Sequence, residues 1–120
     1  MKIIINDHRK IFGIQKEFST MFPNLKLEFY AKAHKVESPA SAHLVLHSSK
    51  TIGECRTIHN RGTFTISPEM RIADFTEHLS EVYGLSARID RKSEHEWIAI
   101  DAKDTKTLAE QNGLLSVASR

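Results

Sequence analysis

The sequence predicts a single α+β domain, residues 1–120, in which one β-α-β unit occurs twice. Residues 63–92 have the pattern of a strand, an amphipathic helix and a second strand, and residues 3–32 repeat it. The matched apolar pairs are Ile5 and Ile66, Ile11 and Ile72, Ile14 and Phe75, Phe18 and Leu79, Met21 and Val82, and Phe22 and Tyr83 at an offset of 61 residues, then Leu25 and Leu85, Leu27 and Ala87, and Phe29 and Ile89 at an offset of 60. Because any amphipathic helix followed by an alternating strand has similar periodicity, the pattern favours a duplication without establishing it.

The first unit begins with residues 3–5, whose β-branched apolar side chains are typical of an interior strand. The polar residues 6–7 are expected to cap a helix. Apolar residues at helical spacing over 11–22 predict that helix, and Pro23 ends it. Residues 25–30 alternate between apolar and polar side chains, which predicts a strand with one wet face.

The second unit has the same signals. Residues 63–66 alternate as a strand does, and residues 67–68, Ser and Pro, are expected to begin a helix. Its buried stripe spans residues 72–83, and the alternation over residues 85–90 predicts the next strand. Residues 97–100 are expected to pair with that strand as a hairpin.

The connections contain two repeated helix-start signals. Residues 51–54 and 107–110 both have capping-box spacing, a Thr followed three residues later by Glu. The second brief helix is expected to end at residues 112–113, Asn and Gly. Residues 35–41 are the most loop-like stretch, and residues 42–49 are ambiguous between a short strand and a helical turn.

Together these elements predict a mixed sheet of four or five strands with two main helices on one face. A duplicated β-α-β order of this kind is that of ferredoxin-like folds, which are the first expectation.

The composition predicts a globular protein of the cytoplasm. The 120 residues are 40% hydrophobic and 27% charged, with a formal net charge of +2. Cys55 is the single cysteine, so no intramolecular disulfide can form, which suits a reducing compartment. No apolar run has the length of a signal peptide or a membrane span, so we expect no membrane contact.

Four stretches, FPNLKLEF, MRIADFTEHLSEVYGL, RKSEHEW and TLAEQN, resemble a family of small uncharacterised bacterial proteins over most of the chain. That resemblance implies no activity, so it transfers no site residues. From Thr63 onward the chain is also similar to the β-grasp, or ubiquitin-like, fold, in which a strand, a helix, a hairpin and a short turn follow in that order. This second likeness makes β-grasp the alternative architecture and implies a fold alone.

Two kinds of chemistry are weighed for the His and Cys residues. One thiolate and three imidazoles suit zinc, and the candidate ligands are His43, His47, Cys55 and His59. A nucleophilic Cys55 with His59 as its base is the other reading. Against both, seven His residues in 120 produce such spacings by chance, and Cys55 falls on an apolar stripe. We therefore predict no metal, no cofactor and no enzymatic activity.

The open face of the sheet is the remaining candidate site. Its proposed binding residues combine aromatic and basic side chains: Lys26, Tyr30, Lys32, Arg88, Lys92 and Trp97. Such a face could stack bases and hold phosphates, but Glu28 and Asp90 lie in the same rows and would repel them.

We therefore predict a non-enzymatic protein–protein interaction module, whose partner is another protein or a second copy in a homodimer. A single-stranded nucleic-acid-binding domain and a small metal-binding protein are the alternatives. Reversing the charge of Arg88 is expected to weaken association without lowering the stability of the monomer.

Overall fold

The computed structural model describes residues 1–30, 50–56 and 58–118, which form three α-helices and two antiparallel sheets of two and three strands. They build one compact α+β domain, so the predicted fold class is confirmed. The predicted loop at 35–41, the ambiguous stretch 42–49 and Lys32 lie outside the described residues. In the described part of the chain, no helix is both long and apolar enough to cross a membrane.

The strands pair between the two halves of the chain. In the two-stranded sheet, β1 (Lys2–Ile5) pairs with β3 (Gly62–Thr65). In the three-stranded sheet, β4 (Ala87–Lys92) lies between β2 (Leu25–Phe29) and β5 (Trp97–Ala99). The expectation of one mixed sheet is therefore wrong, because strands of one half pair antiparallel with strands of the other.

The two main helices form where their apolar stripes predict them. Helix α1 (Ile11–Met21) buries Ile11, Ile14 and Phe18, and helix α2 (Ile72–Tyr83) buries Ile72, Phe75, Leu79 and Tyr83. Gly84 ends α2 in the left-handed conformation, at φ 65°, and its N–H donates to the carbonyl of Ser80 at 3.1 Å. Val82 and Tyr83 were both expected in the buried stripe, but only Tyr83 is buried, and Val82 is 38% exposed.

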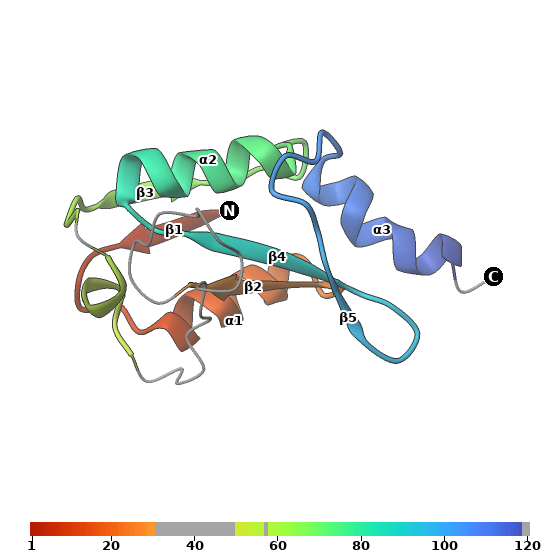
Figure 1. Cartoon of the computed structure of the whole chain (residues 1–120), viewed down its shortest axis with the longest axis horizontal. Helices are drawn as coiled ribbons and strands as arrows, with labels where there is room; N and C mark the ends of the chain where they lie inside the picture. The colour runs from red at the N-terminus through yellow and green to blue at the C-terminus, as the bar shows by residue number, and fades with distance from the viewer. Residues whose placement is uncertain (31–49, 57, 119–120) are drawn as a thin grey trace.

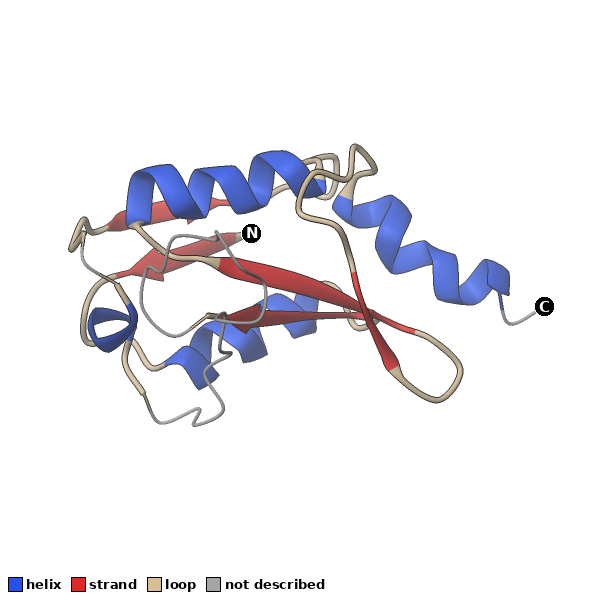
Figure 2. Ribbon diagram, viewed as in Figure 1, coloured by secondary structure: helices blue, strands red, loops and turns tan. Residues whose placement is uncertain are grey.

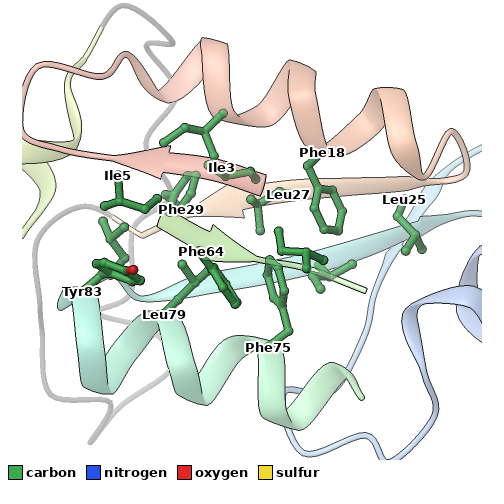
Figure 3. Close-up of a cluster of buried hydrophobic side chains, with 14 of the residues drawn as sticks. Ile3, Ile5, Phe18, Leu25, Leu27, Phe29, Phe64, Phe75, Leu79 and Tyr83 are labelled. Atoms are coloured by element: carbon green, nitrogen blue, oxygen red, sulfur yellow. The ribbon is translucent and has the colours of Figure 1, made fainter. Parts of the chain in front are cut away.

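Figures 1 and 2 show α1 and α2 on opposite sides of the strands rather than together on one face. The side chains between them form the core, which Figure 3 shows in close-up. Phe18 of α1 meets Phe75 of α2 there, with ring centroids 5.3 Å apart. The expected arrangement is therefore wrong. The two helices pack on a shared core from opposite sides instead of covering one face of a single sheet.

The helices begin later than their polar residues predict. The N-cap positions are Lys10 and Arg71, and neither side chain caps its helix. Instead the first helical N–H groups donate to the carbonyls of distant residues: Ile11 N–H to Lys50 at 2.9 Å and Ile72 N–H to Lys106 at 3.0 Å. At each helix a backbone carbonyl from later in the chain, that of Lys50 or Lys106, thus replaces the side-chain cap and accepts from an N–H group that has no partner within the helix. We call the two segments that carry these carbonyls the straps.

Each strap leads into one of the predicted capping boxes. The Thr51 side chain accepts from the N–H of Glu54 at the start of the short 3-10 helix η2 (Ile52–Cys55). The Thr107 side chain accepts from the N–H of Glu110 at 3.1 Å at the start of α3 (Leu108–Ala118). Both capping boxes are confirmed. Helix α3 continues past its expected end at residues 112–113, because Gly113 does not adopt the positive φ that would end the helix there.

Candidate interaction surface

The outward face of the β2–β4–β5 sheet brings together the residues predicted for it. Residues directly opposite in an antiparallel pair share a face. The register sets Lys26 opposite Asp90, Glu28 opposite Arg88, and Lys92 opposite Trp97. Of the predicted binding residues, Lys26, Arg88, Lys92 and Trp97 therefore share one surface, which we call the open face. Lys32 lies outside the described residues.

Arg88 is held by an acidic neighbour on its own strand. Its Nε and Nη2 atoms donate to the two carboxylate oxygens of Asp90 at 2.6 and 2.9 Å. Asp90 is only 3% exposed, so its carboxylate is largely shielded from water, whereas the Arg88 side chain keeps 30% of its surface exposed. The hydrogen bonds to Asp90 raise the pKa of Arg88, and Tyr30 contributes in the same direction. The interaction with Arg88 places Tyr30 with the other open-face residues. The positive charge of Arg88 is already balanced by Asp90 within the chain.

Among the described residues, Lys26 and Glu28 also have partners on or beside the open face. Lys26 Nζ lies 4.9 Å from the centroid of the Trp97 ring, a cation–π arrangement. Gln15 of α1 donates to the Glu28 carboxylate at 3.4 Å, and desolvation by burial raises the pKa of Glu28. Lys92 is exposed, and Trp97 keeps 40% of its surface exposed. The open face therefore presents an aromatic ring among paired charges of both signs, which does not form a continuous basic track for phosphates.

The two outer edges of this sheet differ. At the β2 edge, α1 side chains reach the strand carbonyls: Gln15 Nε2 donates to Leu27 O at 2.8 Å and Ser19 Oγ to Leu25 O at 3.2 Å. At the β5 edge, the N–H of Ile100 donates to Ile89 O, which turns the backbone groups of alternate residues away from β4.

By that alternation, Trp97 and Ala99 point their N–H and C=O groups outward from β5. No residue in the described ranges pairs with these backbone groups. Both side chains are exposed. An edge of this kind can accept another strand.

Of the residues considered for metal and for nucleophilic catalysis, the structure describes Cys55 and His59. Cys55 is buried, and desolvation raises the pKa of its thiol, which disfavours the thiolate that both chemistries need. His59 is half exposed, and its Nδ1 lies 2.8 Å from an Asp7 carboxylate oxygen. His43 and His47 lie outside the described residues. Within the described ranges, no group of three or more His, Cys, Asp and Glu side chains could hold a metal. Because two of the four candidate ligands are not described, the zinc hypothesis stays untested.

A buried arginine cluster has no clear signal in the sequence. Arg56 has a fully buried side chain whose Nε and Nη2 donate to Asp7 Oδ1 at 3.1 and 2.9 Å. Its Nη1 donates to the carbonyl of Tyr83 at the end of α2 at 3.0 Å. Hydrogen bonds from His59 and then Arg56 lower the pKa of Asp7. The cluster joins three segments far apart in the chain, so residue spacing could not reveal it.

Comparisons with protein-family models, with curated proteins and with solved structures yield no match to this chain. The two resemblances noted in the sequence therefore stay predictions, and the inference of function depends on the geometry described above.

Proposed function

We propose that this chain is a non-enzymatic protein–protein interaction module that binds through the β5 edge and the adjoining open face. The observation that carries the proposal is the exposed Trp97 on a strand whose outward backbone groups have no partner in the described residues. Tryptophan is enriched at interfaces, where its large ring contributes much of the binding energy. Arg88 is paired with Asp90, and Lys26 lies over the ring of Trp97, so neither cation is available for a phosphate. This favours a protein partner over a polyanion.

We further propose that the domain is an internal duplication arranged about an approximate two-fold axis. When such an axis passes through an antiparallel strand pair, one residue lies opposite its own counterpart. Ile3 pairs with Phe64, its counterpart at the offset of 61, and Glu28 pairs with Arg88, its counterpart at the offset of 60. Both strand pairs thus agree with the alignment of the two units. This arrangement would replace the ferredoxin-like and β-grasp alternatives, which were built on a single sheet.

The backbone straps extend this correspondence beyond the β-α-β units. The hydrogen bond from Ile52 N–H to Arg9 O, at 2.8 Å, has its counterpart in that from Leu108 N–H to Met70 O, at 2.9 Å. Helix-side residues correspond at the offset of 61, and strap residues at an offset of 56. Each repeat would then consist of a strand, a helix, a second strand and a strap that ends in a capping box. Strand β5 would be an addition to the second repeat and the strand available for contact.

Self-association provides the direct test of the interaction module. Light scattering over a range of micromolar concentrations should give an average mass above the 13.7 kDa monomer. Trp97→Ala should lower that mass at each concentration. Val82→Ala is the control, because Val82 is also an exposed apolar residue but lies on α2, away from the open face. Equal association of wild type and Trp97→Ala would refute the proposed surface.

Arg88 is a poor position for this test, contrary to the sequence-based expectation. Reversing its charge would leave the buried carboxylate of Asp90 without its partner, and this would destabilise the monomer itself. Lys92→Glu is the better charge reversal, since Lys92 is exposed at the end of β4.

Single-stranded nucleic-acid binding is retained as the runner-up function, and we expect it to be weak. Any binding should fall steeply as salt rises, because phosphate contacts release counterions. Titration with mixed single-stranded RNA and DNA would test it. Submicromolar affinity that Trp97→Ala or Tyr30→Ala abolishes would favour nucleic acid over a protein partner.

A further inference from the structure

We infer that this chain also binds a second copy of itself head to tail, with the Phe12 ring on α1 of one copy inserted into a hollow beside α2 of the next. This contact is separate from the open face and goes beyond the proposed function. It uses the two main helices, which lie on opposite sides of the strands (Figure 1). The two surfaces occupy matching places in the two halves of the chain and are complementary in shape and charge.

Each main helix borders a hollow where it meets the three-stranded sheet. The hollow beside α1 has a volume of about 240 Å³, and the hollow beside α2 has a volume of about 360 Å³. The helix residues that line the first are Phe12, Gln15, Lys16 and Ser19, and those that line the second are Ala73, Thr76, Glu77 and Ser80. All four pairs correspond at the offset of 61 that relates the two β-α-β units. The hollows are therefore equivalent in position, and what distinguishes them is the type of residue in each lining.

The first pair of positions is complementary in size. Phe12 keeps 54% of its surface exposed, which is a large apolar area to leave in water. At the equivalent position of α2, Ala73 has only a methyl group, and the hollow around it has a mainly apolar lining that includes Ala87 and Ala102. A Phe12 ring from a second copy would fill this space and bury apolar surface on both sides of the contact.

The exposed charges beside these residues are opposite in sign. Helix α2 has three acidic residues, among them Glu77, and no Lys or Arg. The single acidic residue of α1, Glu17, pairs with Arg9. Lys16 and Glu77 are both exposed, and within the part of the chain that the structure describes neither forms an ion pair. Charge complementarity thus favours α2 of a second copy as the partner of α1.

The spacing of the four residues fits parallel packing of α1 from one copy along α2 from the next. Phe12 and Lys16 are four residues apart on one face of α1, and Ala73 and Glu77 are four residues apart on α2. With the Phe12 ring at Ala73, two helices that run in the same direction bring Lys16 to Glu77. Because the ring and the hollow are different surfaces, the contact is heterologous, and each pair of copies keeps a free ring at one end and a free hollow at the other. Association should therefore continue past the dimer as concentration rises.

Mixing two complementary variants tests this contact, in a Trp97→Ala parent so that the proposed open-face contact does not contribute. Phe12→Ala removes the ring and keeps the hollow, whereas Ala73→Phe fills the hollow and keeps the ring. In sedimentation velocity, each variant alone should associate at least about tenfold more weakly than the parent, because a central aromatic residue dominates such an interface. Their equimolar mixture should form a dimer and nothing larger. Ile4→Ala, which removes an equally exposed apolar side chain on β1, should associate like the parent.

A charge exchange tests the parallel arrangement without filling the hollow. Lys16→Glu and Glu77→Lys should each weaken association at least about threefold, and the double variant should restore it. The matched control is Lys16→Glu combined with Glu81→Lys, which has the same net charge but should not restore association, because Glu81 does not line the hollow. Circular dichroism melts check that every variant is folded.

The outcomes separate this contact from the proposed open face. A Trp97→Ala parent that is monomeric at every concentration overturns the head-to-tail contact and leaves the open face as the site of association. Association of the parent that Phe12→Ala does not weaken, or a mixture that forms no dimer, also overturns the contact. Restoration by Glu81→Lys in place of Glu77→Lys overturns the parallel packing on Glu77. Association that persists in the parent, is lost in Phe12→Ala and returns on mixing supports the inference, whatever the Trp97 substitution shows for the open face.

Discussion

Truncating Phe18 to alanine tests whether the two helices close a common core. The Phe18 side chain is 0% exposed, and its ring centroid lies 5.3 Å from those of both Phe22 and Phe75. Removing a buried phenylalanine costs about 3–5 kcal/mol, because apolar burial is lost and a cavity is left behind. Because both ring contacts are lost as well, we take the middle of that range and expect a loss of about 4 kcal/mol.

Chemical and thermal unfolding both measure this loss. Urea unfolding followed by circular dichroism should show a lower midpoint with an unchanged slope. An unfolding entropy of about 2.1 cal/mol/K per residue converts the loss to a fall in Tm of about 16 °C for a chain of 120 residues. Leu79→Ala, at the corresponding position of α2, should cost about 2–5 kcal/mol for the same reason.

Phe12 provides the matched control for this experiment. It lies on the same helix and is 54% exposed, so Phe12→Ala should change stability by less than about 0.5 kcal/mol. A loss below about 1 kcal/mol for Phe18→Ala, or one no larger than that for Phe12→Ala, would refute the assignment of the buried face of α1.

Three further predictions concern other parts of the molecule. In the folded protein, hydrogen bonds from His59 and Arg56 lower the pKa of Asp7. Ionised Asp7 therefore stabilises the fold above the ordinary aspartate pKa of about 3.9, and this stabilisation is lost as the pH falls through the lower pKa of the folded state. Asp7→Asn should therefore be less stable than wild type near neutral pH, with a difference that narrows in urea melts toward pH 2 or so. Gly84→Ala should lower the free energy of unfolding by about 1–2 kcal/mol, because φ is positive at this residue. Gly113→Ala should stabilise α3 by up to about 1 kcal/mol, because Gly113 lies within the helix with open space around it. Thermal melts of the two variants compare these effects. Protein purified without a histidine tag or chelator should contain far less than one equivalent of zinc by elemental analysis; near-stoichiometric zinc that is lost in Cys55→Ala would contradict this.

The candidate surface was partly predictable. Alternation along two strands placed Lys26, Arg88 and Lys92 on one wet face, because side-chain direction in a strand depends only on position along it. The commitment of Arg88 to Asp90 could not be predicted, since both are charged residues that a wet face would ordinarily leave in water. For the same reason Arg56 gave no sign of being buried, because its partners Asp7 and Tyr83 are distant in the chain.

Local patterns in the sequence by themselves determined the two buried helix stripes, the strand segments and both capping boxes. These features depend on the spacing of side chains within a few turns or along one strand. Only the tertiary structure decided which strands pair, where each helix begins and which sheet edge has no partner among the described residues. Antiparallel partners such as Ile3 and Phe64, and straps such as Lys50 to Ile11, join residues far apart in the chain. Their free energies depend on how the whole core closes, and no periodicity within one segment contains that information.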